Sequence, residues 1–318
     1  MNNLYKPEGM LISTSQNREF VAFGRMGLER AAERGAIVEA TVLLCDSEMN
    51  LHVDICGVKA IIPREEVCYC PGGEEVKDIA IITRVGKPVC FKVISVEDRG
   101  GRAYAILSRR AAQIECMNNY LADLIPGDII PSRVTHLENF GAFVDIGCGI
   151  VGLLSVDCIS ISRFSHPKDR LRNGMYIYTV LKSVDEENKR FFVSLRELLG
   201  TWEENAAHFK PGQTVAGIIR SVESYGVFVE LMPNLAGLAE LKEGFVPHSD
   251  VNGKYAAVYI KSIIPERMKI KLVLVDSYAE EAKCQKIDYF VDCKSVSHID
   301  GWKYSPDACE RYIGTVFI

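Results

Sequence analysis

The sequence lacks the features that would place it in several large protein classes. No stretch approaches eighteen consecutive apolar residues, so we expect no membrane-spanning segment and no membrane partner. The first twenty residues contain no uninterrupted apolar core behind basic residues, which argues against a secretory signal peptide. The eleven cysteines, odd in number and irregularly spaced, are therefore expected to be reduced thiols in a cytoplasmic protein.

Patterns that carry catalysis or bind metals are also scarce. No glycine-rich phosphate loop with its lysine is present, so nucleotide hydrolysis is not expected. Cys68 and Cys70 form half of a zinc pattern, but no second cysteine or histidine pair follows at ligand spacing, and metal-free thiols are the simpler interpretation. The histidines have no recognisable nucleophile partner, and the carboxylates lack the pairing of a metal-dependent nuclease. We expect no catalytic residue, metal or cofactor.

What is present indicates several small globular domains. A chain of 318 residues is long enough for two to four small domains, and 48% hydrophobic with 25% charged residues is a globular composition. The formal net charge is -5. Any polyanion would have to be held by local basic patches, because the field of the whole molecule would repel it.

An internal repeat is the most informative feature. The stretch from 224 to 241 repeats the pattern of 139 to 156: an aromatic residue, Gly, a small apolar residue, Phe, Val, an acid and later a Gly-Leu pair. Phe228 follows Phe143 by 85 residues (228 − 143). A weaker copy lies upstream, with His52 in the place of Phe143 and 91 residues before it (143 − 52). Five short strand-like runs in each copy predict small closed β-barrels.

The remaining segments predict helices and a small mixed tail. An amphipathic helix is expected to end near Gly35, and two short helical links are expected between the barrels. The tail contains a strand-like run over 288–293 and an amphipathic segment with Ser305 as a helix N-cap. It is expected to pack on the third barrel through Tyr289, Phe290, Trp302 and Tyr312. The expected domain limits are 1–30 for the N-terminal helical segment, 31–115, 120–200 and 207–276 for the three barrels, and 277–318 for a C-terminal α/β extension.

Strand alternation places a phenylalanine on a solvent-facing surface. Successive side chains point to opposite faces, so Phe143 shares its side with Asp145, and Phe140 lies just across a glycine. Exposed aromatic rings on a barrel stack bases of any identity, at ~1–3 kcal/mol per base. The alternative is that Phe140 belongs to the core at the barrel corner and that a link covers Phe143. The recurrence of the pair as Tyr225 and Phe228 favours base stacking.

Basic residues would supply the contacts to phosphate that non-specific nucleic-acid binding needs. The connection between the third and fourth strands of the second copy contains four cations and only one acid, Asp169. It is predicted to be a phosphate-facing edge, and the alternative is a solvated loop whose charges cancel. Two more cations lie nearby in the pattern. The six candidates are Arg163, Lys168, Arg170, Arg172, Lys182 and Arg190.

Four motifs of the second copy resemble the S1-type RNA-binding domain of the ribosomal protein S1 family: the lead "PGD", "FGAFVDIG", "GLLSV" and the closing "VSLREL". The resemblance covers about residues 30 to 276 in three units, as in a short three-domain form, and is only partial in the first. It implies five-stranded OB-fold barrels that bind single-stranded RNA through two aromatics, a histidine, an aspartate and a basic residue. Those positions hold Phe140, Phe143, Ser155, Asp185 and Arg190 in the second unit, and Tyr225, Phe228, Glu240, Pro265 and Lys269 in the third.

Three functions remain open from the sequence. The resemblance implies a non-enzymatic protein that acts in translation by holding unstructured mRNA at the small ribosomal subunit. A regulatory RNA-binding protein that never docks on the ribosome is the alternative. A processing enzyme is disfavoured, because three barrels and a short tail leave no room for a catalytic domain. The first unit has Met49 and His52 in the aromatic places, so it is the candidate for docking on the subunit and the weakest expected RNA binder.

Overall fold

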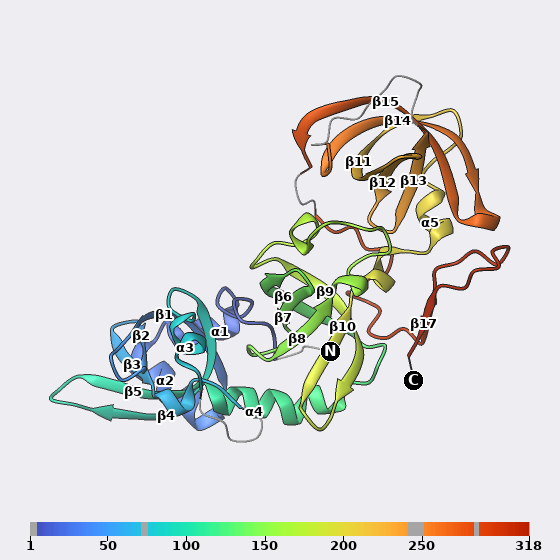
Figure 1. Ribbon diagram of the computed structural model, residues 1–318. Coiled ribbons are helices and arrows are strands. Elements are labelled where there is room, and N and C mark those ends of the chain that lie inside the picture. Colours follow the sequence, from blue (N-terminus) through green and yellow to red (C-terminus); the bar gives the residue numbers. More distant parts are fainter. Residues whose placement is uncertain (1–4, 71–75, 241–250, 283–285, 318) are drawn as a thin grey trace.

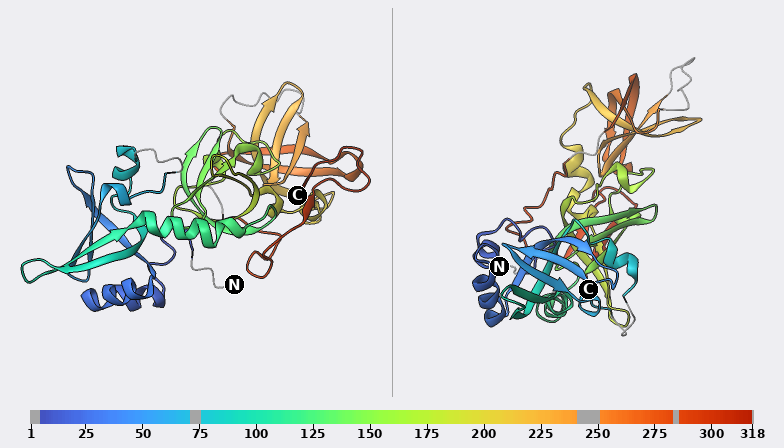
Figure 2. Two further views of the ribbon diagram at one scale, coloured as in Figure 1. Left: turned by 90° about the horizontal axis from the view of Figure 1, so that it is seen from below. Right: turned by 90° about the vertical axis from the view of Figure 1, so that its left-hand side faces the viewer.

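The structure consists of three small β-barrels that follow one another along the chain (Figure 1). It is a computed structural model that describes residues 5–70, 76–240, 251–282 and 286–317. Each barrel is closed and has five strands, with the first strand paired to the fourth and the third paired to the fifth. The barrels lie in a row, so the molecule is elongated (Figure 2). The mainly β fold with three five-stranded barrels, predicted from the repeat, is confirmed.

Alternating burial along the strands gives each barrel its own hydrophobic core. The first barrel has β1 (Ile37–Cys45), β2 (Leu51–Ile55), β3 (Val58–Ile62), β4 (Pro88–Asp98) and β5 (Ala103–Ser108). The second has β6 (Ile129–Glu138), β7 (Gly141–Asp145), β8 (Val151–Ser155), β9 (Tyr176–Asp185) and β10 (Arg190–Ser194). The third has β11 (Thr214–Glu223), β12 (Gly226–Met232), β13 (Leu235–Glu240), β14 (Lys254–Ile264) and β15 (Lys269–Glu281).

Short helices precede, decorate and connect the barrels. The α-helices are α1 (Ser15–Val21), α2 (Gly24–Arg34), α3 (Asp78–Ile82), α4 (Arg109–Asn119) and α5 (Trp202–Ala206). The 3₁₀ turns are η1 (Arg64–Glu66), η3 (Leu121–Asp123), η4 (Val156–Cys158), η5 (Pro167–Asp169), η6 (Arg196–Leu199) and η7 (Pro265–Arg267). Within the described ranges, no helix has the length and apolarity that crossing a bilayer requires.

The N-terminal helical segment differs from the single helix expected there. It is broken into α1 and α2, because Gly24, the first residue of α2, adopts a positive φ of 52°. The two helices also pack closely: a Cβ at Gly27 would collide with the carbonyl oxygen of Phe20. The predicted end is confirmed, since Gly35 closes α2 in the left-handed conformation.

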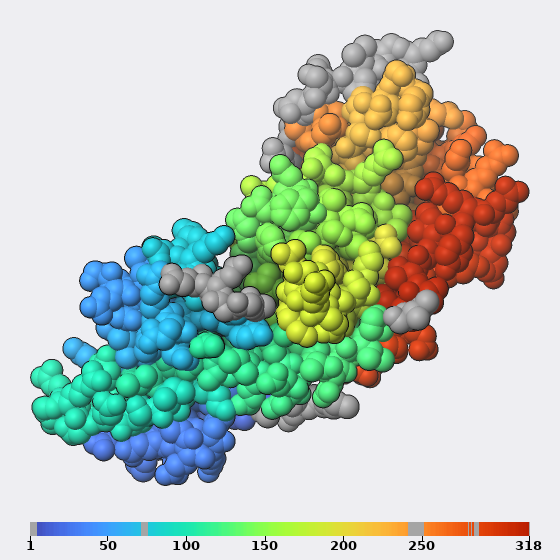
Figure 3. All heavy atoms as spheres, turned by 60° about the horizontal axis from the view of Figure 1, so that its bottom comes forward, coloured from blue at the N-terminus to red at the C-terminus, as the bar shows by residue number. Residues whose placement is uncertain are grey.

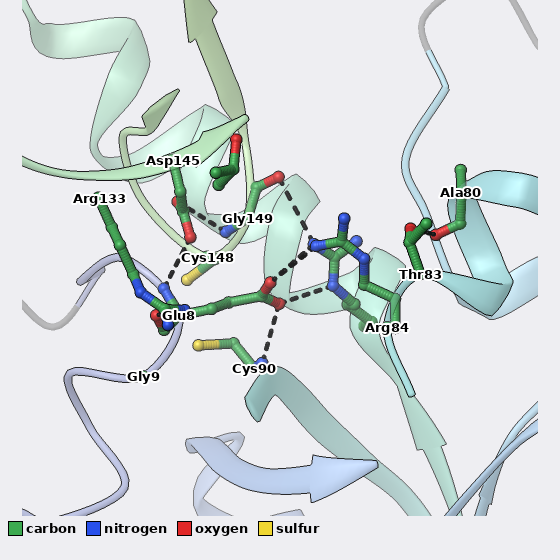
Figure 4. A network of polar contacts seen from close by, with 12 residues as sticks. Glu8, Gly9, Ala80, Thr83, Arg84, Cys90, Arg133, Asp145, Cys148 and Gly149 are labelled. Atoms are coloured by element: carbon green, nitrogen blue, oxygen red, sulfur yellow. Dashed lines mark hydrogen bonds and ion pairs between the residues drawn. The ribbon is translucent and has the colours of Figure 1, made fainter. Parts of the chain in front are cut away.

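The N-terminal segment joins the first barrel to the second (Figure 4). The Glu8 carboxylate accepts hydrogen bonds from Arg109 Nε at 2.6 Å and from the Cys90 N–H at 3.1 Å, and the Glu8 N–H donates to Asp145 Oδ2 at 2.7 Å. Asp145 is only 2% exposed. The expectation that it faces solvent beside Phe143 is therefore wrong, because the N-terminal segment covers it.

The tail contacts the second barrel as well as the third, so the expectation that its aromatic residues all pack on the third barrel is wrong: Trp302 packs there, but Tyr289 lies against the core of the second barrel and Tyr312 is 61% exposed. The Ile129 N–H donates to the Ser297 carbonyl at 2.8 Å, while Tyr304 is 5% exposed and its hydroxyl donates to the Asn234 carbonyl in the third barrel. In the space-filling view the tail forms a continuous band along both barrels (Figure 3). It contains the strands β16 (Gly301–Lys303) and β17 (Gly314–Val316) and no helix among its described residues.

The helix expected after Ser305 is therefore wrong, as is the strand expected over 288–293. Pairing of β16 with β17 turns the intervening segment into a loop, across which the Tyr304 N–H donates to the Ile313 carbonyl at 2.9 Å. The Ser305 hydroxyl accepts a hydrogen bond from the Ile313 N–H at 2.7 Å instead of capping a helix.

Within the described ranges no disulfide joins two cysteines. In the same ranges, no group of histidine, cysteine and carboxylate side chains is arranged to hold a metal ion.

Candidate nucleic-acid interface

A row of side chains crosses the outer face of the second barrel. Strand register places His136 of β6 opposite Phe143 of β7, Phe143 opposite Leu153 of β8, and Leu153 opposite Phe192 of β10. All four are at least partly exposed, whereas their neighbours along the strands, such as Val144, fill the core. We call His136, Phe143, Leu153 and Phe192 the cross-strand row of the second barrel.

Phe140 extends this row beyond the strand. It lies in the turn before β7, is 54% exposed, and meets Phe143 edge to face with ring centroids 5.9 Å apart. The alternative that Phe140 is a core residue is therefore wrong. Gly141 makes this arrangement possible, because a Cβ there would collide with the carbonyl oxygen of Leu154 on the adjacent strand.

The third barrel repeats the aromatic pair. Tyr225 is 63% exposed and meets Phe228 edge to face, with centroids 6.2 Å apart. The equivalent cross-strand row of the third barrel differs from that of the second barrel at the positions around Phe228. It consists of Ser221, Phe228, Leu238 and Lys271. Two barrels thus present an equivalent aromatic pair at the same place in the fold, with one exposed ring and one partly buried ring.

The first barrel has no such pair. Its cross-strand row is mostly aliphatic and consists of Leu44, His52, Ile61 and Ile106. The His52 ring is bound to the Asp46 carboxylate, with Nε2 and Oδ2 2.7 Å apart. Hydrogen bonds from His52 and then from Asn50 lower the pKa of Asp46 to about 2. The His52 ring is thus held by Asp46, and its cross-strand neighbours are aliphatic.

The basic residue that precedes the last strand is exposed in both aromatic barrels. Arg190 begins β10 opposite Asp185 in the register, and Lys269 begins β15 opposite Ile264. Asp185 has a local structural role: its carboxylate accepts hydrogen bonds from the Asn188 side chain at 2.8 Å and from the Asn188 N–H at 3.0 Å, which lower its pKa. Asp185 therefore shapes the β9–β10 turn that presents Arg190.

Arg170 does not face phosphate, contrary to the sequence-based expectation. Its side chain is 9% exposed, and both terminal nitrogens bind the carboxylate of Glu230 on β12. Arg220 binds the same carboxylate through Nε at 2.8 Å and lies 3.6 Å from Asp169. A buried charge requires such a partner, so Arg170 serves the joint between the second and third barrels.

The rest of the basic connection is divided between two roles. Ile161 donates its N–H to the Asn234 side chain at 2.9 Å, so the first part of the loop also belongs to the joint. The side chains of Arg163, Lys168 and Arg172 are exposed and form no ion pair with any residue in the described ranges. Lys182 is exposed too, with Nζ 3.3 Å from the sulfur of Cys158.

Three members of the cross-strand row, His136, Leu153 and Phe192, are not identified by the sequence analysis. Phe192 follows the core residue Phe191, so alternation alone would have placed it on the outer face. His136 has no neighbouring motif in the sequence, and only the register between β6 and β7 shows that it lies beside Phe143.

Comparisons with known proteins agree with this architecture. A family model described as "S1 RNA binding domain" matches residues 123–196. Small ribosomal subunit protein bS1 of Rickettsia conorii is 29% identical over 221 residues, which cover 68% of this chain and 37% of that protein. The bS1 homolog of Bacillus subtilis is 32% identical over 163 residues, which cover 50% of this chain and 42% of that protein.

A crystal structure of a multidomain protein with nucleic acid binding domains from Streptococcus pneumoniae covers 76% of this chain and 74% of its own, at 16% identity and a TM-score of 0.24. This chain spans about two fifths of the length of the curated relatives it matches. The match to the family model shows that the second barrel is an S1 RNA binding domain, and the aligned part of the chain is similar in sequence to small ribosomal subunit protein bS1.

Proposed function

We propose that this protein is a non-enzymatic single-stranded RNA-binding protein that holds unstructured mRNA at the small ribosomal subunit. The observation that carries the proposal is the edge-to-face aromatic pair on the barrel surface, one ring exposed and one partly buried, which occurs at the same position in two consecutive barrels. Such rings bind any unpaired base through its π-face and need no particular sequence. The protein would then bind mRNA with little preference for its sequence.

The proposed RNA contacts fall into two groups. The stacking residues are Phe140 and Phe143 in the second barrel and Tyr225 and Phe228 in the third. The phosphate contacts are the exposed cations, namely Arg163, Lys168, Arg172, Lys182, Arg190 and Lys269. Because the second barrel has most of these cations, we propose that affinity falls in the order second, third, first. The domain limits of 31–115 and 120–200 define the first two units in this proposal, and the third runs from 207 to the end of β15 at Glu281 instead of the expected 276.

The ribosomal part of the proposal rests on the relatives, which are named small ribosomal subunit protein bS1. The first barrel is the proposed docking unit, because its row is aliphatic and it lacks the stacking pair. A regulatory RNA-binding protein that stays off the ribosome is the second candidate. Co-sedimentation of the full chain with small subunits distinguishes the two: recovery in the subunit peak supports docking, and its absence favours the regulatory protein.

A comparison of unpaired and paired RNA tests the core of the proposal. Stacking needs unpaired bases, so the full chain should bind an unstructured oligonucleotide more tightly than a duplex of the same length. Binding should weaken as salt rises, with a slope that corresponds to only a few phosphates, because the net charge is -5. Fluorescence anisotropy at several salt concentrations measures both. Equal affinity for the duplex, or no effect of salt, would contradict the proposal.

A further inference from the structure

His136 is an exposed ring beside the proposed stacking pair, at a position that is not among the contact residues implied by the family resemblance. We propose that His136 is a third base-stacking residue of the second barrel and that it extends the platform of Phe140 and Phe143 to three rings. The ligand is an unpaired base of single-stranded RNA, so this inference rests on the proposed function. Histidine is among the side chains on which proteins stack unpaired bases.

The geometry places the three rings next to one another. His136 and Phe143 are cross-strand partners, their ring centroids lie 6.5 Å apart, and their planes differ by only 20°. On the other side of Phe143, Phe140 lies 5.9 Å away and nearly perpendicular. The His136 side chain is 58% exposed, so its ring is accessible to a base.

A neighbouring carboxylate fixes the orientation of the ring. His136 Nε2 lies 2.8 Å from Glu138 Oε1, two residues along the same strand. A side chain that is already oriented loses less rotational freedom when it binds, and this favours affinity. Glu138 is therefore a positioning residue, because it acts on the base only through His136.

Folding of the barrel does not require a ring at this position. The register-equivalent residue is Ser221 in the third barrel and Leu44 in the first, and both barrels close in the same way. His136 is also exposed and lies outside the hydrophobic core of its own barrel. The ring at position 136 therefore makes the surface of the second barrel different from the surfaces of the other two barrels, and the fold does not depend on it.

His136 also fits a gap in the second barrel. The resemblance implies a histidine at the position that Ser155 occupies, at the end of β8. Ser155 has no ring to stack, whereas His136 supplies an imidazole from β6, on the other side of β7. The second barrel would then have a histidine in its RNA-binding face from a different strand.

Four variants of the full chain test the proposal with a short unstructured RNA. His136→Ala should weaken binding about 5- to 150-fold, the equivalent of ~1–3 kcal/mol for one stacked base. His136→Phe should bind close to the parent, because it keeps a ring. His208→Ala is the matched control and should not change affinity, since His208 is an exposed histidine that packs edge to face on Phe290, 5.8 Å away. Phe140→Ala with Phe143→Ala removes the stacking pair of the second barrel, so the remaining RNA affinity comes from the third barrel. Adding Ser221→His to this double variant should raise that remaining affinity, because it places a ring beside Phe228.

The proposal is overturned if His136→Ala binds as tightly as the parent, or if His136→Phe is as weak as His136→Ala. Unchanged thermal melting of each variant shows that an affinity loss is not a folding defect. Failure of this inference is distinguishable from failure of the proposed function. If only the inference fails, the Phe140→Ala and Phe143→Ala double variant still loses RNA while His136→Ala keeps it. If the parent does not prefer single-stranded RNA, both are overturned.

Discussion

Replacing Glu230 with alanine should destabilise the joint between the second and third barrels by several kcal/mol. The Glu230 carboxylate is shared by Arg170 and Arg220, and the three side chains are 3%, 9% and 6% exposed. Removing it leaves two guanidinium groups without their main partner in a buried site. Breaking a buried ion pair by removing one partner costs ~3–5 kcal/mol. We expect Glu230→Ala to lie within or above this range, because two cations lose their partner together.

The third barrel also supplies a matched control. Glu240 pairs with Lys261 at 3.4 Å, and both side chains are 55% exposed. An exposed pair of this kind contributes about 0–1 kcal/mol, so Glu240→Ala should change stability little. Arg170→Ala should be milder than Glu230→Ala, because Glu230 keeps its bonds to Arg220.

Tryptophan fluorescence during urea unfolding is a suitable assay. The two tryptophans of the chain, Trp202 and Trp302, both pack in or against the core of the third barrel, next to the joint. The unfolding midpoint of Glu230→Ala should fall far below those of the parent and Glu240→Ala, with Arg170→Ala between them. If Glu230→Ala and Glu240→Ala are equally stable, the buried network does not hold the joint together.

Three further perturbations have defined outcomes. Burial, and then the charge of Glu8, raise the pKa of Asp145 to about 7 from its ordinary 3.8, so the folded state holds a proton that the unfolded state has lost. The free energy of unfolding should therefore fall as pH rises. Asp145→Asn has no carboxyl group to ionise, so between pH 5 and 7 its free energy of unfolding, measured in urea titrations, should fall by ~2 kcal/mol less than that of the parent. Parallel pH profiles for the two proteins would contradict this. Tyr304→Phe removes the hydrogen bond to Asn234 and should lower stability by ~1 kcal/mol in the same assay, and an unchanged midpoint would show that the tail contact is dispensable. His52→Ala should leave RNA affinity unchanged in anisotropy titrations, and a large loss would show that the first barrel binds RNA.

The barrels could be predicted from the sequence because their determinants are local and repeated. Alternation over β7 placed Ala142 and Val144 in the core and Phe143 outside, and the repeat at 85 residues supplied the third barrel. Gly141 and Gly226 mark the close strand approach in both copies. These features depend on neighbours within a few residues, so a single sequence contains them.

The features that the sequence did not reveal depend on contacts between distant segments. Strand alternation places Asp145 on the outer face, but the N-terminal segment covers it. The N–H of Glu8, 137 residues away in the sequence, donates a hydrogen bond to the Asp145 carboxylate. Arg170 belongs to a basic run that resembles a phosphate-binding edge, and only the docking of the third barrel brings Glu230 to it. Ser305 has the signature of a helix N-cap, but β-pairing across the tail prevents the helix. Local patterns predict elements well and the partners of their side chains poorly.

The aromatic pair of the second barrel carries the central claim, and a double substitution tests it most directly. Phe140→Ala with Phe143→Ala removes two rings that each stack a base, at ~1–3 kcal/mol per base, so affinity for unstructured RNA should fall by ~2–6 kcal/mol. Circular dichroism must show the barrels intact, because Phe143 is partly buried. A folded double variant that has lost this affinity in anisotropy titrations supports the account, and a folded double variant that binds RNA as tightly as the parent contradicts it.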